Sequence, residues 1–238
     1  MIKIISKEKC SGCHACSNAC PQNCIKMIAD DEGFQYPVVN SQDCINCGSC
    51  EKVCPVIHKQ QPDKRKQTTA FAAINHNEEI RLQSSSGGIF TVIAEYIINQ
   101  NGVVFGSAFS DNFKAVEHIC VDNTDDLRKL RGSKYVQSKI GDTYKQAKAV
   151  LDNGRIVLFT GTPCQIAGLY TYLQKPYDNL YTQDIICHGV PSPMVWQKYV
   201  EDHEKKPGLL PGECFSDIRN MAGKPSQCYL NFQIALHT

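Results

Sequence analysis

The chain has 238 residues, enough for one large domain or two smaller ones, and its hydrophobic content of 42% is ordinary for a globular protein. A formal net charge of +1 argues against the basic surface that binds nucleic acid. No signal-peptide pattern follows Met1, and the longest apolar stretch is too short to cross a bilayer. We therefore expect a cytoplasmic protein with no membrane span and no nucleic-acid partner.

Cysteine is the unusual residue: the chain has fourteen, and nine of them precede residue 55. The runs CSGCHACSNACP and CINCGSCEKVCP both follow the spacing C-x2-C-x2-C-x3-C-P. This spacing is typical of 4Fe–4S clusters, in which the cysteine before proline binds the neighbouring cluster. We predict an α+β ferredoxin-like domain with two 4Fe–4S clusters over residues 1–57. The expected ligands are Cys10, Cys13, Cys16 and Cys54 for one cluster and Cys44, Cys47, Cys50 and Cys20 for the other.

Structural zinc is the alternative for C-x2-C pairs, but two complete runs that end in Cys-Pro fit it poorly. Cys24 has no place among the eight expected ligands, and we expect it to be a buried small residue. A polar stretch without apolar periodicity follows, and residues 58–69 are the expected linker.

Beyond the linker, alternating apolar patterns predict an α/β domain with a mixed, partly parallel sheet over residues 70–238. The expected strands are residues 71–75, 103–109, 115–121, 134–138, 155–160 and 179–187. The expected helices are residues 78–83, 89–99, 124–130, 142–151, 165–173 and 193–204, with Asn77, Thr124, Thr162 and Ser192 as N-caps. Residues 207–238 show no clear period.

The segment TGTPCQ predicts the start of a helix, with Pro163 at its first position and Gln165 completing a capping box with Thr162. Cys164 then lies among unpaired N–H groups, which favour a thiolate or hold a phosphate. The next strand ends in CHGVPSP, so Cys187 and His188 would share the same edge of a parallel sheet, where ligands bind. Thiol catalysis by Cys164 with His188 as base is one hypothesis, and two packed cysteines beside an ordinary loop histidine is the other.

Two further loops have the composition of anion sites. SSSGG, residues 84–88, offers hydroxyls and a flexible backbone before a helix, and RGSKYVQS, residues 131–138, combines cations with an aromatic ring. Together they indicate a cofactor with phosphates and a flat ring, such as a flavin nucleotide. The G-x-G-x-x-G fingerprint is absent, which disfavours a dinucleotide site of the Rossmann type.

The double cysteine run followed by SSSGG, RGSKYVQS, GTPCQIAGL and DIICHGVPSP resembles the coenzyme F420 hydrogenase/dehydrogenase beta-subunit family, over most of the chain. The resemblance implies an oxidoreductase in which the clusters exchange electrons with a flavin, FAD or FMN, that exchanges a hydride with coenzyme F420 or another acceptor. It also implies a redox partner protein or partner subunits. Members are usually longer, so we expect the second domain to be incomplete after about residue 206.

Carried over position by position, the family's flavin site would be lined by Ser84, Ser85, Ser86, Gly87, Gly88, Arg131, Ser133, Lys134, Tyr135, Gln137, Gly161, Thr162, Pro163, Cys164 and Gln165. Some members carry a third 4Fe–4S cluster, to which Cys164 and Cys187 would contribute. Two other functions stay open: an electron carrier or docking subunit without its own catalysis, and the thiol enzyme of Cys164 and His188.

Overall fold

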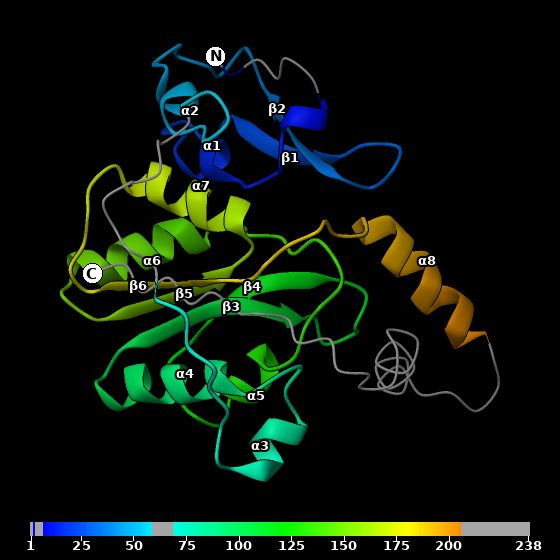
Figure 1. Ribbon diagram of the computed structural model, residues 1–238. Coiled ribbons are helices and arrows are strands. Elements are labelled where there is room, and N and C mark those ends of the chain that lie inside the picture. Colours follow the sequence, from blue (N-terminus) through cyan, green and yellow to red (C-terminus); the bar gives the residue numbers. More distant parts are fainter. Residues whose placement is uncertain (1, 3–6, 59–68, 206–238) are drawn as a thin grey trace.

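The computed structural model describes residue 2 and residues 7–58 and 69–205 (Figure 1). The expected linker, apart from its end residues 58 and 69, and the expected incomplete end after residue 206 lie outside these ranges. Within the described ranges, no helix has the length and apolar character that crossing a bilayer requires.

The N-terminal module combines short helices with one β-hairpin. Its elements are η1 (Lys7–Lys9), α1 (Ala15–Asn18), β1 (Ile25–Ala29), β2 (Gln35–Val39) and α2 (Ser49–Lys52). The two strands pair antiparallel, with Ile25 opposite Val39. Its own core is small and consists mainly of thiols: the buried cluster is Ile2, Cys16, Cys20, Cys24, Ile25 and Cys50. Cys24 is buried, as expected.

The second module is built on a four-stranded sheet in the order β4-β3-β5-β6. The strands are β3 (Val103–Phe109), β4 (Val116–Val121), β5 (Val157–Gly161) and β6 (Leu180–Asp184). β3 pairs antiparallel with β4 and parallel with β5, and β5 pairs parallel with β6. The prediction of a mixed, partly parallel sheet is confirmed.

Helices cover both faces of this sheet (Figure 1). α6 (Thr143–Asp152) and α7 (Pro163–Leu173) cover one face, and α4 (Ile89–Asn99) and α5 (Leu127–Leu130) cover the other. α3 (Glu78–Leu82) and α8 (Pro193–Glu204) lie outside these layers (Figure 1). Alternate residues of a strand point to opposite faces: Phe105 and Phe159 pack in one core cluster with α6 and α7, whereas Val104 and Leu158 pack in another with α4 and α5.

The two modules share the first of these core clusters. Ala15 and Val53, which are 1% and 0% exposed, come from α1 and from the end of α2, yet they pack in the cluster that contains Phe159 and Leu169. Helix α1 lies next to α7 (Figure 1). The loops that carry the cysteine runs are therefore docked on the helical layer over the sheet.

Helices with strong end signals begin and end as predicted. α4 and α8 have the expected bounds, and α3 starts after Asn77, whose side chain accepts a hydrogen bond from the Ile80 N–H. The helix after residue 160 starts at Pro163, and the capping box of Thr162 and Gln165 is formed.

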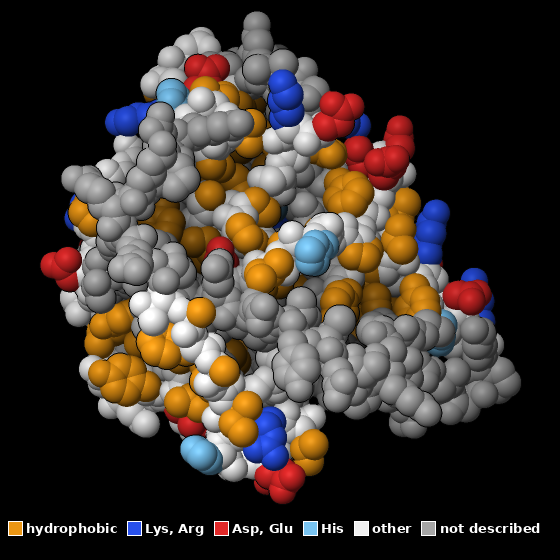
Figure 2. Space-filling view, viewed as in Figure 1, with side chains coloured by type: hydrophobic (Ala, Val, Ile, Leu, Met, Phe, Trp, Pro, Cys, Tyr) orange, Lys and Arg blue, Asp and Glu red, His pale blue; other side chains and the backbone are white. Residues whose placement is uncertain are grey.

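Three element predictions are wrong. Residues 71–75 form no strand, and Phe71 and Ile74 are 82% and 61% exposed. Exposed hydrophobic side chains also gather over α4 (Figure 2). Residues 134–138 form no strand either, since the Gln137 N–H bonds the carbonyl of Pro191 and only an isolated bridge joins residue 139 to β4. The helix predicted from Thr124 begins three residues later, at Leu127.

Candidate functional site

Four cysteines line a first cavity in the N-terminal module. They are Cys10, Cys13, Cys16 and Cys54. The first three come from the loop before α1 and from α1 itself, whereas Cys54 follows α2 and belongs to the second cysteine run. The fold thus brings the last cysteine of one run to the other run's cavity.

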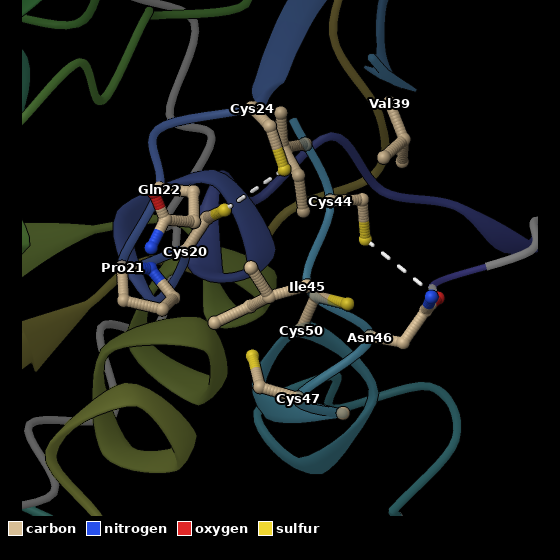
Figure 3. A pocket seen from close by; sticks show the side chains of 12 residues that line it. Cys20, Pro21, Gln22, Cys24, Val39, Cys44, Ile45, Asn46, Cys47 and Cys50 are labelled. Atoms are coloured by element: carbon tan, nitrogen blue, oxygen red, sulfur yellow. Dashed lines mark hydrogen bonds between the residues drawn. The ribbon is translucent and has the colours of Figure 1, made fainter. Parts of the chain in front are cut away.

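A second cavity has the reciprocal composition (Figure 3). Its cysteines are Cys44, Cys47 and Cys50 from the second run, Cys20 from the first run, and Cys24. The Sγ atoms of Cys20 and Cys24 lie 3.3 Å apart, and the Cys47 thiol lies 3.3 Å from the hydroxyl of Ser49. Cys47 is exposed, whereas Cys50 and Cys20 are buried.

The two cysteine loops share one backbone conformation. In the first run Gly12 and His14 have φ of 62° and 63°, and at the corresponding positions of the second run Asn46 and Gly48 have φ of 54° and 75°. Left-handed residues curl a loop tightly. A Cβ on Gly12 would also lie 2.9 Å from the carbonyl oxygen of Gln35, so that position requires glycine.

The donors suit iron–sulfur clusters. Within the described residues, no three His, Cys, Asp or Glu side chains converge on a single-ion site, and the sulfurs instead surround the two cavities. Burial raises the pKa of Cys13 to about 11 and that of Cys16 to about 12. These thiols are protonated in the cluster-free chain, so cluster assembly must release protons.

The first cavity lies directly against the second module. A Cβ on Gly168 of α7 would come within 3.1 Å of the Sγ of Cys13. Two hydrogen bonds cross nearby: the Asn18 amide donates to the Gly141 carbonyl at 2.8 Å, and the Gln137 amide donates to the Ser11 carbonyl at 3.5 Å.

The segment of residues 131–138 joins the other predicted flavin segments. At one end the Ser133 N–H donates to the Ser85 hydroxyl at 2.7 Å, and Arg131 donates to Thr91 and to Gln83. At the other end the N–H of Gln137 meets the carbonyl of Pro191 in the CHGVPSP loop. Segments separated widely in the sequence therefore meet around this stretch.

Sequence reasoning missed a buried hydrogen-bond network behind this segment. The Ser138 hydroxyl lies 3.0 Å from Nδ1 of His118 and accepts from the Gln165 amide at 2.9 Å. Nε2 of His118 lies 3.0 Å from the Thr160 carbonyl, and its ring stacks on Phe159. Burial lowers the pKa of His118 to about 4, so the imidazole is neutral at pH 7.

The same network fixes the start of α7. The Gln165 side-chain oxygen accepts from the Thr162 N–H at 2.9 Å while its amide reaches Ser138. The fully buried Tyr144, also missed, donates its hydroxyl to the Gln165 carbonyl at 2.7 Å. The contacts of Ser138 and Tyr144 with Gln165 join residues distant in sequence, so no local pattern predicts them.

The structure does not bring Cys164, Cys187 and His188, the three residues expected at one edge of the sheet, into hydrogen-bond contact with one another. The Cys164 thiol lies 3.1 Å from the Thr162 hydroxyl. Cys187 and His188 are exposed in the loop after β6. In the described part of the chain, no hydrogen bond joins Cys164 to Cys187 or to His188.

Two amide oxygens near the carboxyl edge of the sheet lack partners. The side-chain oxygens of Gln137 and Gln183 are buried and accept no hydrogen bond from any described residue. Gln183 lies next to the end of β6 and pairs in register with Thr160. A buried acceptor without a donor costs free energy, so a bound group with an N–H would satisfy it.

Comparison with known proteins identifies each part of the chain. Residues 9–57 match the 4Fe-4S dicluster domain. Residues 70–144 match the N-terminal part of the coenzyme F420 hydrogenase/dehydrogenase beta subunit, and residues 154–224 match its C-terminal part. None of the curated proteins matches.

Among solved structures, the chain is similar to one from the F420-reducing NiFe hydrogenase complex of Methanosarcina barkeri, with 19% identity and a TM-score of 0.47. The alignment covers 61% of this chain and 53% of that chain. The chain thus spans about half the length of that relative.

Proposed function

The chain belongs to the coenzyme F420 hydrogenase/dehydrogenase beta-subunit family and carries a 4Fe-4S dicluster domain, and from this premise we propose that it is an iron–sulfur flavoprotein subunit of an oxidoreductase. When bound, the clusters supply one-electron transfer, and a flavin supplies hydride exchange with coenzyme F420 or another small-molecule acceptor. A redox partner protein or partner subunits provide the other end of the electron path.

The contact of Cys13 with helix α7 is the observation that carries this proposal. It brings the first cysteine-lined cavity to the helix whose N-terminal segment is one of the expected flavin segments. Gln137 strengthens the connection, because it belongs to another such segment and donates to the Ser11 carbonyl within the first cysteine loop.

The cysteines would hold the clusters in the crossed arrangement of the two cavities. Cys10, Cys13, Cys16 and Cys54 hold one, and Cys44, Cys47, Cys50 and Cys20 hold the other. Cys16 is buried and Cys13 is partly buried, and Cys13 packs against the core cluster of the second module.

The loops of the second module would hold the flavin. Ser84, Ser85, Ser86, Gly87 and Gly88 would offer hydroxyl and N–H groups to a phosphate, and Arg131 would offer positive charge. The unpartnered oxygens of Gln137 and Gln183 would accept hydrogen bonds from N–H groups of a bound flavin. The neutral His118 holds Ser138, and through it Gln165, in place.

Anaerobic reconstitution of the chain with iron, sulfide, FMN and FAD tests the proposal. We expect about eight irons per chain from two clusters, and a flavin that is released on acid treatment and identified by its fluorescence. Clusters without flavin would contradict the proposal and favour an electron carrier or docking subunit. About twelve irons would add the third cluster of Cys164 and Cys187.

The variant Cys164→Ser separates the roles of that cysteine, with Cys120→Ser, at an exposed site on β4, as the matched control. A lower iron content in the Cys164 variant alone would make it a ligand. Lost turnover with iron and flavin unchanged would instead favour the thiol chemistry of Cys164 and His188.

A further inference from the structure

Gly168 lies in the interior of the eleven-residue helix α7, where glycine costs about 1 kcal/mol relative to alanine. The surroundings explain why glycine is there. A Cβ at this position would lie 3.1 Å from both the Cβ and the Sγ of Cys13, and 2.9 Å from the Tyr144 hydroxyl. Any larger residue would push the cysteine loop or Tyr144 away from the helix, so the missing side chain is what permits their close approach.

The two cavities differ in their relation to the second module. Beside the first, Cys13 contacts α7, and Ala15 is fully buried in the core that both modules share. Beside the second, Cys47 is exposed and Ile45 is 60% exposed. Cys20, Cys24 and Cys50 of the second cavity are buried, but its Cys47 side faces solvent. We therefore call the cavity that contacts the second module the inner one and the other the outer one.

We propose that Gly168 is a positioning residue that seats Cys13 against α7, so that electrons pass between the modules through the inner cavity. The outer cavity then faces an external one-electron redox protein. This inference rests on the proposed function. Each crossing moves one electron, so two crossings accompany each two-electron change at the flavin, and the external protein supplies or accepts both electrons.

Electron tunnelling slows steeply with distance, so a displaced Cys13 slows the crossing without affecting exchange at the outer cavity. The test is Gly168→Ala in the anaerobically reconstituted chain. Gly102→Ala is the matched control. A Cβ at Gly102, just before β3, would also be crowded, at 2.6 Å from a methyl carbon and 2.7 Å from the carbonyl oxygen of Ile97, whose core cluster is not the one that Cys13 packs against.

Two measurements report the result. An EPR-monitored redox titration gives the potential of each cluster, after Cys13→Ser and Cys47→Ser have identified the signal of each cavity. Stopped-flow absorbance gives the rate of flavin reduction by a one-electron donor. We expect Gly168→Ala to keep about eight irons, to shift only the inner signal, and to slow flavin reduction at least about tenfold. Gly102→Ala should change neither measurement.

A shift of the outer signal, or wild-type potentials together with a wild-type rate, would overturn the proposal. If Gly168→Ala fails to retain iron, the double variant with Tyr144→Phe restores space beside the new methyl group and should show the inner shift. A chain that binds no flavin contradicts the proposed function, yet the cluster potentials still test the seating of Cys13.

Discussion

The two modules are built around different kinds of core. The N-terminal module surrounds its two cavities with thiols, and among its described residues the buried cluster contains only two aliphatic side chains, Ile2 and Ile25. The second module buries Phe105, Phe159 and Leu169 between a sheet and its helices. The difference teaches that a short segment can form a defined binding site from the spacing of its ligands. In such a segment, ligand binding contributes the folding free energy that an apolar core supplies elsewhere.

Removing the iron should produce the largest effect. We expect an anaerobic chelator to unfold the N-terminal module, because the binding free energy of the clusters is part of its folding free energy, while the second module stays folded. Limited proteolysis and hydrogen exchange would locate the change. If hydrogen-exchange protection of the N-terminal module were unchanged by iron removal, the clusters would not be what holds its core together.

The crossed arrangement of the cavities predicts the effect of a single ligand change. Cys54→Ser should lower the iron content from about eight to about four per chain, because one cluster loses a ligand. Its remaining EPR spectrum should match that of Cys10→Ser, although Cys54 belongs to the second run. A match to Cys44→Ser would show that each run holds its own cluster.

The second module should owe part of its acid sensitivity to His118. Burial lowers the pKa of His118 from 6.5 to about 4, so the unfolded chain takes up a proton at a higher pH than the folded chain does. Stability is therefore lost as the pH falls from 6.5 towards 4, by about 3 kcal/mol at 1.36 kcal/mol per pKa unit.

Urea unfolding across this pH range would measure that loss. The variant His118→Gln should show a shallower profile, whereas His76→Gln, at an exposed site, should follow the wild type. His14, whose pKa burial also lowers to about 4, contributes a separate loss that remains in both variants. A His118→Gln profile as steep as the wild type's would exclude this role for the imidazole.

The smallest expected effect on stability concerns the N-cap of α8, a helix of the second module whose folding does not depend on a cluster. The hydroxyl of Ser192 accepts from the Val195 N–H at 3.3 Å and caps α8. Ser192→Ala should lower the free energy of unfolding by about 1 kcal/mol. Gln197→Ala, at an exposed site on the same helix, should change it by less than about 0.5 kcal/mol, and equal effects of the two changes would argue against the cap.

The parts of the fold that sequence predicted well are those with local signals. Local signals mark the start of α8, at Ser192 and Pro193, and the end of α4, where Asn101 takes the left-handed conformation just before Gly102. The sequence of residues 71–75 does not show whether these apolar residues form a strand, because a strand exists only where a neighbouring strand is available to pair with it.

The residues of the candidate site also fall into those that local sequence predicts and those that it does not. Cysteine spacing alone predicted eight of the cysteines that line the cavities, since the two runs fold into similar loops, but it gave no place to Cys24, which lines the second cavity. By contrast, His118 and Tyr144 were missed, because they meet Ser138 and Gln165 from positions twenty or more residues away. Such contacts depend on how strands and helices are stacked, and the local sequence carries no sign of them.

Two of the hydrogen bonds across the junction end on main-chain oxygens, those of Gly141 and Ser11, whereas a third runs from the Lys145 ammonium to the side-chain oxygen of Asn23. A carbonyl is present whatever side chain a position carries. Evolution is therefore free to change residue 11 without losing the acceptor, as long as the donor Gln137 persists. Side-chain identity is constrained instead where the two modules pack closely, as at Gly168 beside Cys13.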